Sequence, residues 1–187
     1  MTLSPPRNGP HVGPDVTLND PAFVHDTALI HGRVRMEEGV SVWPYVVMRA
    51  EMHEIRIGAR TNIQDHVMIH VAYGGPTIVG EDCSITHRVV LHGCELGDRV
   101  LIGIGATIMD GAKIGANSIV AGHSIVTENS EFPENSIIAG SPAKLVKVRD
   151  NSAANLMNAR FYHMNGLNYA RGVEVFSDAD MKALAKG

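Results

Sequence analysis

The sequence of 187 residues contains few aromatic side chains, only two cysteines, and no long run of apolar residues or of like charges. Cys83 and Cys94 cannot build a disulfide framework and lack the CxxC spacing of many metal sites, so we expect two small buried side chains. No apolar run is long enough to cross a bilayer, and the first residues lack the apolar stretch of a secretory signal. With 16 Lys and Arg against 20 Asp and Glu, no basic stripe suits nucleic acid or a membrane surface. These absences predict a cytoplasmic protein that binds neither partner.

What the sequence does have is an aliphatic residue at every sixth position through most of its length. Each step from residue 79 to residue 126 is six residues, apart from a single step of five. This period is neither helical nor the alternation of a strand, so it indicates a repeat architecture. It fits an all-β solenoid shaped as a triangular prism, with one hexapeptide per face and about eighteen residues per coil. The aliphatic positions, which we expect to point into the prism, are Val34, Val40, Val46, Ile57, Ile63, Ile69, Val79, Ile85, Leu91, Leu96, Ile102, Ile108, Ile114, Val120 and Val126.

The repeats divide the chain into a β-helix domain, residues 1–147, and a C-terminal helical tail, residues 148–187. Residues 1–20 are rich in Pro and Gly and are expected to form an irregular arm. Two insertions interrupt the period, at residues 51–56 and at residues 71–76, and the second contains a Gly-Gly-Pro sequence typical of a turn. Residues 140–143, Gly-Ser-Pro-Ala, are expected to close the repeats.

The tail is expected to form a helix over residues 150–169, packed on the flank of the prism. An apolar stripe at helical spacing must cover something, and the flank is the available surface. A shorter helix is expected to start at Ser177, with Asp180 in a capping-box-like position. The apolar stripe consists of Ala153, Met157, Phe161 and Met164, and a second stripe consists of Asn155, Asn158, Tyr162, Asn165 and Tyr169.

Stacking arithmetic brings two histidines together. If residues 71–76 are a detour, Ile69 and Leu91 lie one coil apart, and the residues that follow them, His70 and His92, stack at roughly the 4.8 Å spacing of adjacent strands. Two imidazoles at that spacing can share a metal ion. His87 lies on the preceding face, where it is better placed to serve a metal bound by a neighbouring subunit. The three flat faces suit threefold symmetry, so we expect a homotrimer with metal sites at its interfaces.

The other histidines are expected to be surface residues or hydrogen-bonding side chains. His66 lies near the cluster, but the same count stacks it with Arg88 and not with the histidine pair, so we expect it not to bind metal. The remaining ones are His11, His25, His31, His53, His123 and His163.

Several segments within residues 20–147 resemble the γ-class carbonic anhydrases and their relatives on the left-handed parallel β-helix. An Asn-x-Gln-Asp segment followed by a histidine, and then a His-x4-His-Gly pair, form the specific part of the signature, because acyltransferases share the hexapeptide period. The matching segments are Arg49-Ala50-Glu51, Thr61-Asn62-Ile63-Gln64-Asp65, Val67-Met68-Ile69-His70, His87-Arg88-Val89-Val90-Leu91-His92-Gly93-Cys94 and Gly140-Ser141-Pro142-Ala143-Lys144.

The resemblance implies zinc bound by His70, His87 and His92 between the subunits of a trimer, although three imidazoles also accept Fe(II) or Co(II). The reaction would be the reversible hydration of carbon dioxide to bicarbonate, with hydroxide supplied at the metal. The other site residues would have supporting roles. Gln64 would hold the nucleophilic water or bicarbonate, Asp65 would accept a proton or fix a hydrogen bond and pair with Arg49, Asn62 would support the site, and Tyr162 of the tail helix would approach the metal.

Two departures from the family pattern predict slow turnover. Glu51 stands where the family has an aspartate, and residues 71–76 carry no carboxylate to shuttle protons, so that Glu51, His53 or Glu54 would have to substitute. Three other functions stay open: an acyl-CoA thioesterase at the same metal, a hexapeptide acyltransferase that uses one histidine base and no metal, and a non-catalytic trimeric scaffold stapled by zinc.

Overall fold

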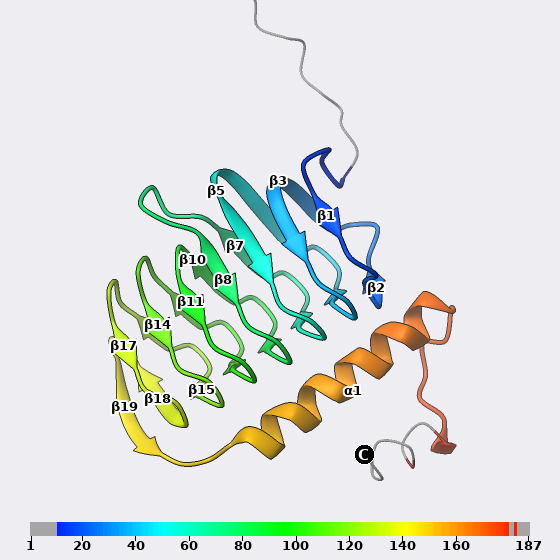
Figure 1. Cartoon of the computed structure of the whole chain (residues 1–187). Helices are drawn as coiled ribbons and strands as arrows, with labels where there is room; N and C mark the ends of the chain where they lie inside the picture. The colour runs from blue at the N-terminus through cyan, green and yellow to red at the C-terminus, as the bar shows by residue number, and fades with distance from the viewer. Residues whose placement is uncertain (1–10, 180–181, 183–187) are drawn as a thin grey trace, which may run out of the picture.

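The computed structural model describes residues 11–179 and 182, and it shows a parallel β-helix with one long α-helix beside it (Figure 1). This confirms the predicted left-handed solenoid of hexapeptide repeats with a C-terminal helix. Short strands alternate with tight corners, and each coil stacks on the previous one. The elements are β1 (Thr17–Leu18), β2 (Phe23–Val24), β3 (Leu29–Met36), β4 (Ser41–Val42), β5 (Val47–Ile57), β6 (Asn62–Ile63), β7 (Met68–His70), β8 (Thr77–Val79), β9 (Ser84–Ile85), β10 (Val90–His92), β11 (Glu95–Leu96), β12 (Leu101–Ile102), β13 (Thr107–Ile108), β14 (Lys113–Ile114), β15 (Ile119–Val120), β16 (Ile125–Val126), β17 (Glu131–Phe132), β18 (Ser136–Gly140), β19 (Ala143–Val148) and α1 (Ser152–Ala170).

Three flat faces run along the prism. Face 1 contains the first part of β3 and of β5, followed by β7, β10, β13 and β16. Face 2 contains β1, the second part of β3 and of β5, then β8, β11, β14 and β17. Face 3 contains β2, β4, β6, β9, β12, β15 and β18, and β19 pairs with β18 in an antiparallel hairpin that closes the repeats. Residues 51–56 do not loop out, because β5 continues through them around the corner between faces 1 and 2.

The aliphatic residues of the six-residue period form the core, as predicted. All of them are at most 2 % exposed, and burying each side chain contributes about 1.5–3 kcal/mol. Leu91 pairs in register with Ile69, which confirms that residues 71–76 are a detour between them. Cys83 and Cys94 are buried, as expected, and burial raises the pKa of each thiol to about 12.

A glycine fixes the chain directly after His92. Gly93 has a φ of +54°, a conformation that L side chains rarely adopt, and a Cβ at this position would lie 2.2 Å from the Cβ of Ala72. Glycine is therefore required where the corner after β10 passes beneath the loop that follows β7. This close approach holds the end of β10 against that loop.

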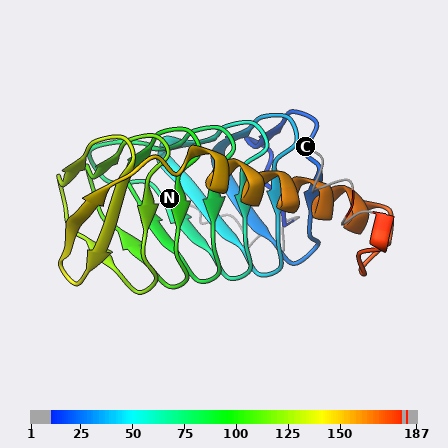
Figure 2. The ribbon, with the colours of Figure 1, turned by 90° about the horizontal axis from the view of Figure 1, so that it is seen from below.

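The helix α1 lies along face 3, beside β2, β4, β6 and β9 (Figure 2). The expectation that its apolar stripe docks there is wrong, because Met157 is 44 % exposed and the ring of Phe161 stacks instead on Phe176, 4.9 Å away. The second stripe faces the prism. Asn155 is buried and donates to the main-chain oxygens of Arg99 and Ser118 at 2.7 and 3.1 Å. The surface of face 3 under the helix presents main-chain carbonyl groups that need hydrogen-bond donors. Asparagine supplies such a donor and methionine does not.

The two ends of the chain differ from the expectation in part. Residues 11–18 belong to the solenoid rather than to an irregular arm, since Val12 bridges Ile30 and β1 pairs with β3. After Ser177 the chain turns helical at residues 178–179, and Asp180 of the expected cap lies outside the described residues. Within the described part of the chain, no helix has the length and apolar character needed to cross a membrane.

Candidate functional site

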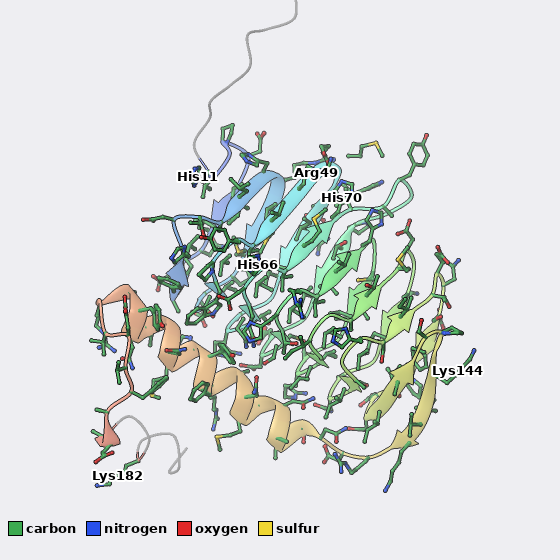
Figure 3. All side chains as sticks on the ribbon, turned by 180° about the vertical axis from the view of Figure 1, so that it is seen from behind. His11, Arg49, His66, His70, Lys144 and Lys182 are labelled. Atoms are coloured by element: carbon green, nitrogen blue, oxygen red, sulfur yellow. The ribbon has the colours of Figure 1, made fainter. Side chains whose placement is uncertain are left out.

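The strands of face 1 run from one corner of the prism to another. We call the corner before these strands the entry edge and the corner after them the exit edge. The entry edge precedes the strands and carries Gln64, Asp65 and His87. The exit edge follows them and carries Arg49, His70, His92 and Asp110. Figure 3 shows Arg49 and His70 together near one corner of the prism, with His66, which follows Asp65, well apart from them. The predicted site residues are therefore divided between the two edges.

His70 and His92 are stacked at the exit edge as predicted. They are paired in register on adjacent strands, their ring centroids lie 5.0 Å apart, and Nδ1 of His70 is 3.0 Å from Nε2 of His92. Arg49, on the preceding coil, is in register with His70, so it belongs to the same column. Both rings are partly exposed, and they can therefore meet a ligand from outside the chain.

A carboxylate holds the outer nitrogen of each ring in this pair. Nε2 of His70 is 3.0 Å from Oε2 of Glu51, and Nδ1 of His92 bonds Oδ1 of Asp110. If both rings are neutral, their protons lie on these outer nitrogens, and the two facing nitrogens both present lone pairs. A cation between the rings stabilises such an arrangement. Zinc–nitrogen bonds of about 2.0–2.1 Å in a tetrahedral site separate two ligand nitrogens by about 3.3 Å, so the pair needs only a small opening to hold the ion.

The Glu51 side chain forms hydrogen bonds at the exit edge, although it is one methylene longer than the aspartate of the family. Its carboxylate bonds both His70 and Arg49. Burial raises the pKa of Glu51, but bonds from its own backbone amide, from His70 and from Arg49 outweigh that effect and lower it. The carboxylate is therefore ionised at neutral pH. A pocket of about 370 Å³ opens beside these groups and is lined by Arg49, Glu51, Met52, His70, Val71, Tyr73 and His92.

The entry edge repeats the pairing of a histidine with a carboxylate. Nδ1 of His87 is 3.0 Å from Oδ2 of Asp65, which leaves Nε2 of this ring for another partner. Gln64 lies beside this pair, 1 % exposed, and its Nε2 donates to Oδ1 of Asn62 at 2.9 Å. Each of the three predicted metal ligands thus has one ring nitrogen within hydrogen-bonding distance of a carboxylate. This pattern is common in zinc sites, because the carboxylate fixes the orientation of the ring and raises its basicity.

Tyr162 lies on the side of α1 that faces the prism. Its ring packs edge-on against Trp43 with centroids 5.8 Å apart. Burial, and to a lesser extent the negative charge of Asp65, raise the pKa of the Tyr162 hydroxyl, which therefore stays protonated at neutral pH. This places the tyrosine on the same side of the prism as the entry edge.

One chain does not assemble all three predicted ligands. Among the described residues, no group of three or more His, Cys, Asp or Glu side chains is arranged to hold a metal ion. His87 is at the opposite edge of face 1 from His70 and His92. Arg49 and Asp65 are also at opposite edges, and within the chain each bonds another partner, Glu51 and His87 respectively. A single chain therefore supplies two different parts of the predicted site.

The sequence did not identify Asp110 as a partner of His92. The available signal was its position 18 residues after His92, one residue beyond the 17 that separate Leu91 from its partner Ile108. His66 stacks on Tyr45 instead of joining the pair, with centroids 5.0 Å apart and an interplanar angle of 13°. His66 and Arg88 both have positive φ, so they occupy equivalent corner positions on successive coils.

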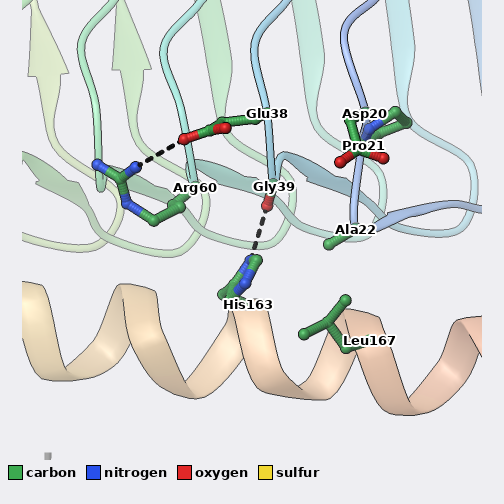
Figure 4. Close-up of a pocket in the computed structure, with 8 residues that line it drawn as sticks. All are labelled: Asp20, Pro21, Ala22, Glu38, Gly39, Arg60, His163 and Leu167. Carbon is green, nitrogen blue, oxygen red and sulfur yellow. Dashed lines mark hydrogen bonds and ion pairs between the residues drawn. The ribbon is translucent and has the colours of Figure 1, made fainter.

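A separate hollow of about 300 Å³ lies between α1 and the first coils (Figure 4). Arg60 bonds Asp82 there at 2.8 Å, and Nδ1 of His163 lies 3.0 Å from the main-chain oxygen of Gly39. The first contact joins two coils of the prism, and the second joins the helix to a coil. The hollow contains none of the predicted site residues; its lining consists of Asp20, Pro21, Ala22, Glu38, Gly39, Arg60, His163 and Leu167.

Comparison with known proteins agrees with the hexapeptide-repeat fold. The family described as bacterial transferase hexapeptide (six repeats) matches residues 93–128. Protein YrdA of Escherichia coli is 43 % identical over 95 residues, covering 47 % of this chain and 52 % of YrdA. The mitochondrial gamma carbonic anhydrase 1 of Arabidopsis thaliana is 32 % identical over 170 residues, covering 87 % of this chain and 60 % of the relative. A crystal structure of a hexapeptide transferase family protein from Anaplasma phagocytophilum has a TM-score of 0.73 at 28 % identity, covering 84 % of this chain and 92 % of that chain.

The repeats, the coil register and these likenesses define a hexapeptide-repeat β-helix protein, a class of enzymes with carbonic anhydrase and transferase relatives. Within that class the chain is similar to gamma carbonic anhydrases, the family that its histidine and Asn-x-Gln-Asp segments resemble. The chain spans between half and two thirds of the length of the curated relatives reported above.

Proposed function

We propose that the chain forms a homotrimer that binds one zinc ion at each interface and catalyses the reversible hydration of carbon dioxide to bicarbonate. His70 and His92 come from one subunit and His87 from the next. The facing lone pairs of the histidine pair, with Glu51 and Asp110 on the outer nitrogens, carry the metal part of the proposal. The resemblance to gamma carbonic anhydrases supports the reaction.

The surface of face 1 supports the trimer. One column of its outward side chains, with one residue per coil, is apolar apart from Thr107, and Leu29 and Ile125 at its ends are 39 and 41 % exposed. The corresponding column on face 2 is largely charged, and α1 covers much of face 3. A threefold rotation that buries face 1 brings the exit edge of one subunit to the entry edge of the next, which would also let Arg49 reach Asp65. The face 1 column is Leu29, Val47, Met68, Val90, Thr107 and Ile125.

The chain's own residues would orient the reactants. When bound to three neutral histidines, zinc keeps an open position and lowers the pKa of water toward neutrality, which supplies hydroxide for attack on carbon dioxide. Gln64 would hold the attacking oxygen by a hydrogen bond, with Asn62 behind it. Asp65 would fix the orientation of His87 and accept a proton, while Arg49 would attract bicarbonate. Tyr162, protonated at neutral pH, would donate a hydrogen bond from the helix.

Proton release would limit the rate. The loop of residues 71–76 has no carboxylate, and two of the substitute groups are already engaged, His53 with the main-chain oxygen of Tyr73 at 3.2 Å and Glu54 with Arg56 at 2.6 Å. Glu51 is held by His70 and Arg49. We therefore expect slow hydration that buffer molecules accelerate, since a diffusible base replaces the missing shuttle.

Metal content and activity test the proposal together. The purified protein is expected to hold one zinc per chain and to hydrate carbon dioxide, with a rate that rises with buffer concentration. His92→Ala is expected to lose the zinc and the activity while the circular dichroism spectrum stays unchanged, because most of the core is aliphatic stacking elsewhere. A His92→Ala protein that keeps one zinc per chain would rule out this ligand assignment, and metal-loaded wild type without hydration would rule out the reaction.

The pocket at the exit edge favours a second candidate activity. A volume of about 370 Å³ with Met52, Val71 and Tyr73 on its walls is larger than carbon dioxide needs. Hydrolysis of an acyl-CoA thioester at the same metal would use that space. Parallel assays with an acyl-CoA series would detect it. Acyl transfer without metal, as in hexapeptide transferases, would persist after chelation, and a scaffold stapled by zinc would dissociate on chelation without showing either activity.

A further inference from the structure

A chain of hydrogen bonds connects α1 to Gln64. The Nε2 group of Gln64 donates to Oδ1 of Asn62 at 2.9 Å. Nδ2 of Asn62 donates to Oγ of Ser84 at 3.0 Å and also to the main-chain oxygen of Cys83 at 3.1 Å. The hydroxyl of Ser84 donates to Oδ1 of Asn158, on the helix, at 2.7 Å. Asn62, Gln64 and Ser84 are each at most 1 % exposed, so water does not compete for the bonds among these three residues.

One backbone group fixes the donor and acceptor sides of the Asn62 and Gln64 amides. The main-chain oxygen of Cys83 can only accept, so the side of the Asn62 amide that faces it must be Nδ2. Oδ1 of Asn62 is therefore the atom that faces Gln64, and Gln64 must offer Nε2. Ser84 accepts from Asn62, so its single proton is left for Asn158. A reversal at Asn62 or Gln64 would set two acceptors or two donors against each other in a buried place, and a reversed Asn158 amide would take away the acceptor of the Ser84 proton.

We infer that Asn158 and Ser84 are positioning residues, through which α1 holds the amide of Gln64 in one orientation that keeps its Oε1 acceptor for the reactants. This rests on the proposed function, in which Gln64 touches the attacking oxygen. With Nε2 turned toward Asn62, the Oε1 atom of Gln64 is left to face the reactants, where it accepts a hydrogen bond from an O–H group. It therefore turns the proton of a water or hydroxide toward itself and leaves an oxygen lone pair for carbon dioxide.

The sequence provides a single probe of this orientation, because Gln64 is the only glutamine in the chain. Labelling with [15N]glutamine gives one pair of side-chain amide signals in a proton–nitrogen correlation spectrum. The wild type is expected to show two separated, slowly exchanging protons. Ser84→Ala and Asn158→Leu should shift both signals and speed their exchange by about three- to tenfold, the loss expected for one hydrogen bond.

Two matched variants on α1 distinguish a positioning role of Asn158 from a general weakening of the contact between the helix and the prism. Asn155→Leu removes the hydrogen bonds from the helix to Arg99 and Ser118. It leaves the hydrogen bonds between Gln64 and Asn158 intact, so the Gln64 signals should stay in place. Asn158→Asp keeps an acceptor oxygen and should retain the wild-type signals. Fluorescence of Trp43, the only tryptophan, reports whether the helix stays docked. If Asn158→Leu undocks the helix, Ser84→Ala, which lies in the prism, decides the question.

The inference would be overturned if the Gln64 signals moved no more in Asn158→Leu and Ser84→Ala than in Asn155→Leu. It would also be overturned if the spectrum of Asn158→Asp matched that of Asn158→Leu. Kinetics give a second measure. Ser84→Ala should lower kcat for carbon dioxide hydration by roughly tenfold with KM and zinc content unchanged. If the wild type does not hydrate carbon dioxide, the proposed function fails, while the spectra still show whether α1 positions Gln64.

Discussion

Mixing two inactive variants tests whether the metal site is shared between subunits. His87→Ala lacks the entry-edge ligand, and His92→Ala lacks one of the exit-edge pair. Each variant alone is expected to bind no zinc tightly. When the two are refolded together in equal amounts, an interface is complete only where the His87→Ala chain supplies the histidine pair and the His92→Ala chain supplies His87.

The expected recovery follows from the symmetry of a trimer. Random association gives mixed trimers in about three quarters of the assemblies, each with one complete interface out of three, so about one quarter of the wild-type sites return. Zinc per chain, measured after excess metal is removed, and hydration activity should both recover to that level. A mixture of His70→Ala with His92→Ala is the matched control, since these ligands share an edge and mixing restores no site. Recovery in that control, or none in the first mixture, would refute the shared site.

Further predictions concern the face 1 surface, an orienting carboxylate and the thiols. Met68→Lys places a charge in the apolar column of face 1 and should give folded monomers in light scattering, whereas an intact trimer would exclude this face as the interface. Asp110→Asn should weaken zinc binding by about 10–100-fold in a chelator competition assay, because His92 loses its orienting partner; an unchanged affinity would show that the carboxylate has no such role. Cys83 and Cys94 should resist a thiol reagent at pH 8 until denaturant is added. Unfolded thiols ionise near pH 8.5, so the free energy of unfolding should fall as the pH rises above about 8.5.

The sequence predicted the coil register well because a period of six allows little freedom. Once Ile69 and Leu91 are assigned to the interior, the residues after them must share an edge, and the His70–His92 pair follows without knowledge of any side-chain contact. The pairing of His92 with Asp110 was missed because it joins a strand end to the following corner, where side-chain direction depends on the local turn and not on the period.

The docking of α1 could not be predicted from hydrophobicity. The period of apolar residues predicted that the helix face with Met157 and Phe161 packs on the prism. The prism surface under the helix, however, presents main-chain oxygens, a serine hydroxyl and one tryptophan ring. Asn155 and Asn158 satisfy those oxygens and that hydroxyl, and Tyr162 packs on the ring of Trp43. The energetic demand of buried polar groups therefore outweighed the burial of apolar area. That demand is set by the prism and is invisible in the helix sequence alone.

A crystal structure of the zinc-loaded protein, with diffraction data collected on both sides of the zinc absorption edge, tests the shared metal site most directly. We expect one anomalous peak per chain, between Nδ1 of His70 and Nε2 of His92 and within bonding distance of His87 from a neighbouring subunit. A peak whose protein ligands all come from one chain, or stacked rings at the exit edge with no metal between them in a protein shown to contain zinc, would contradict it.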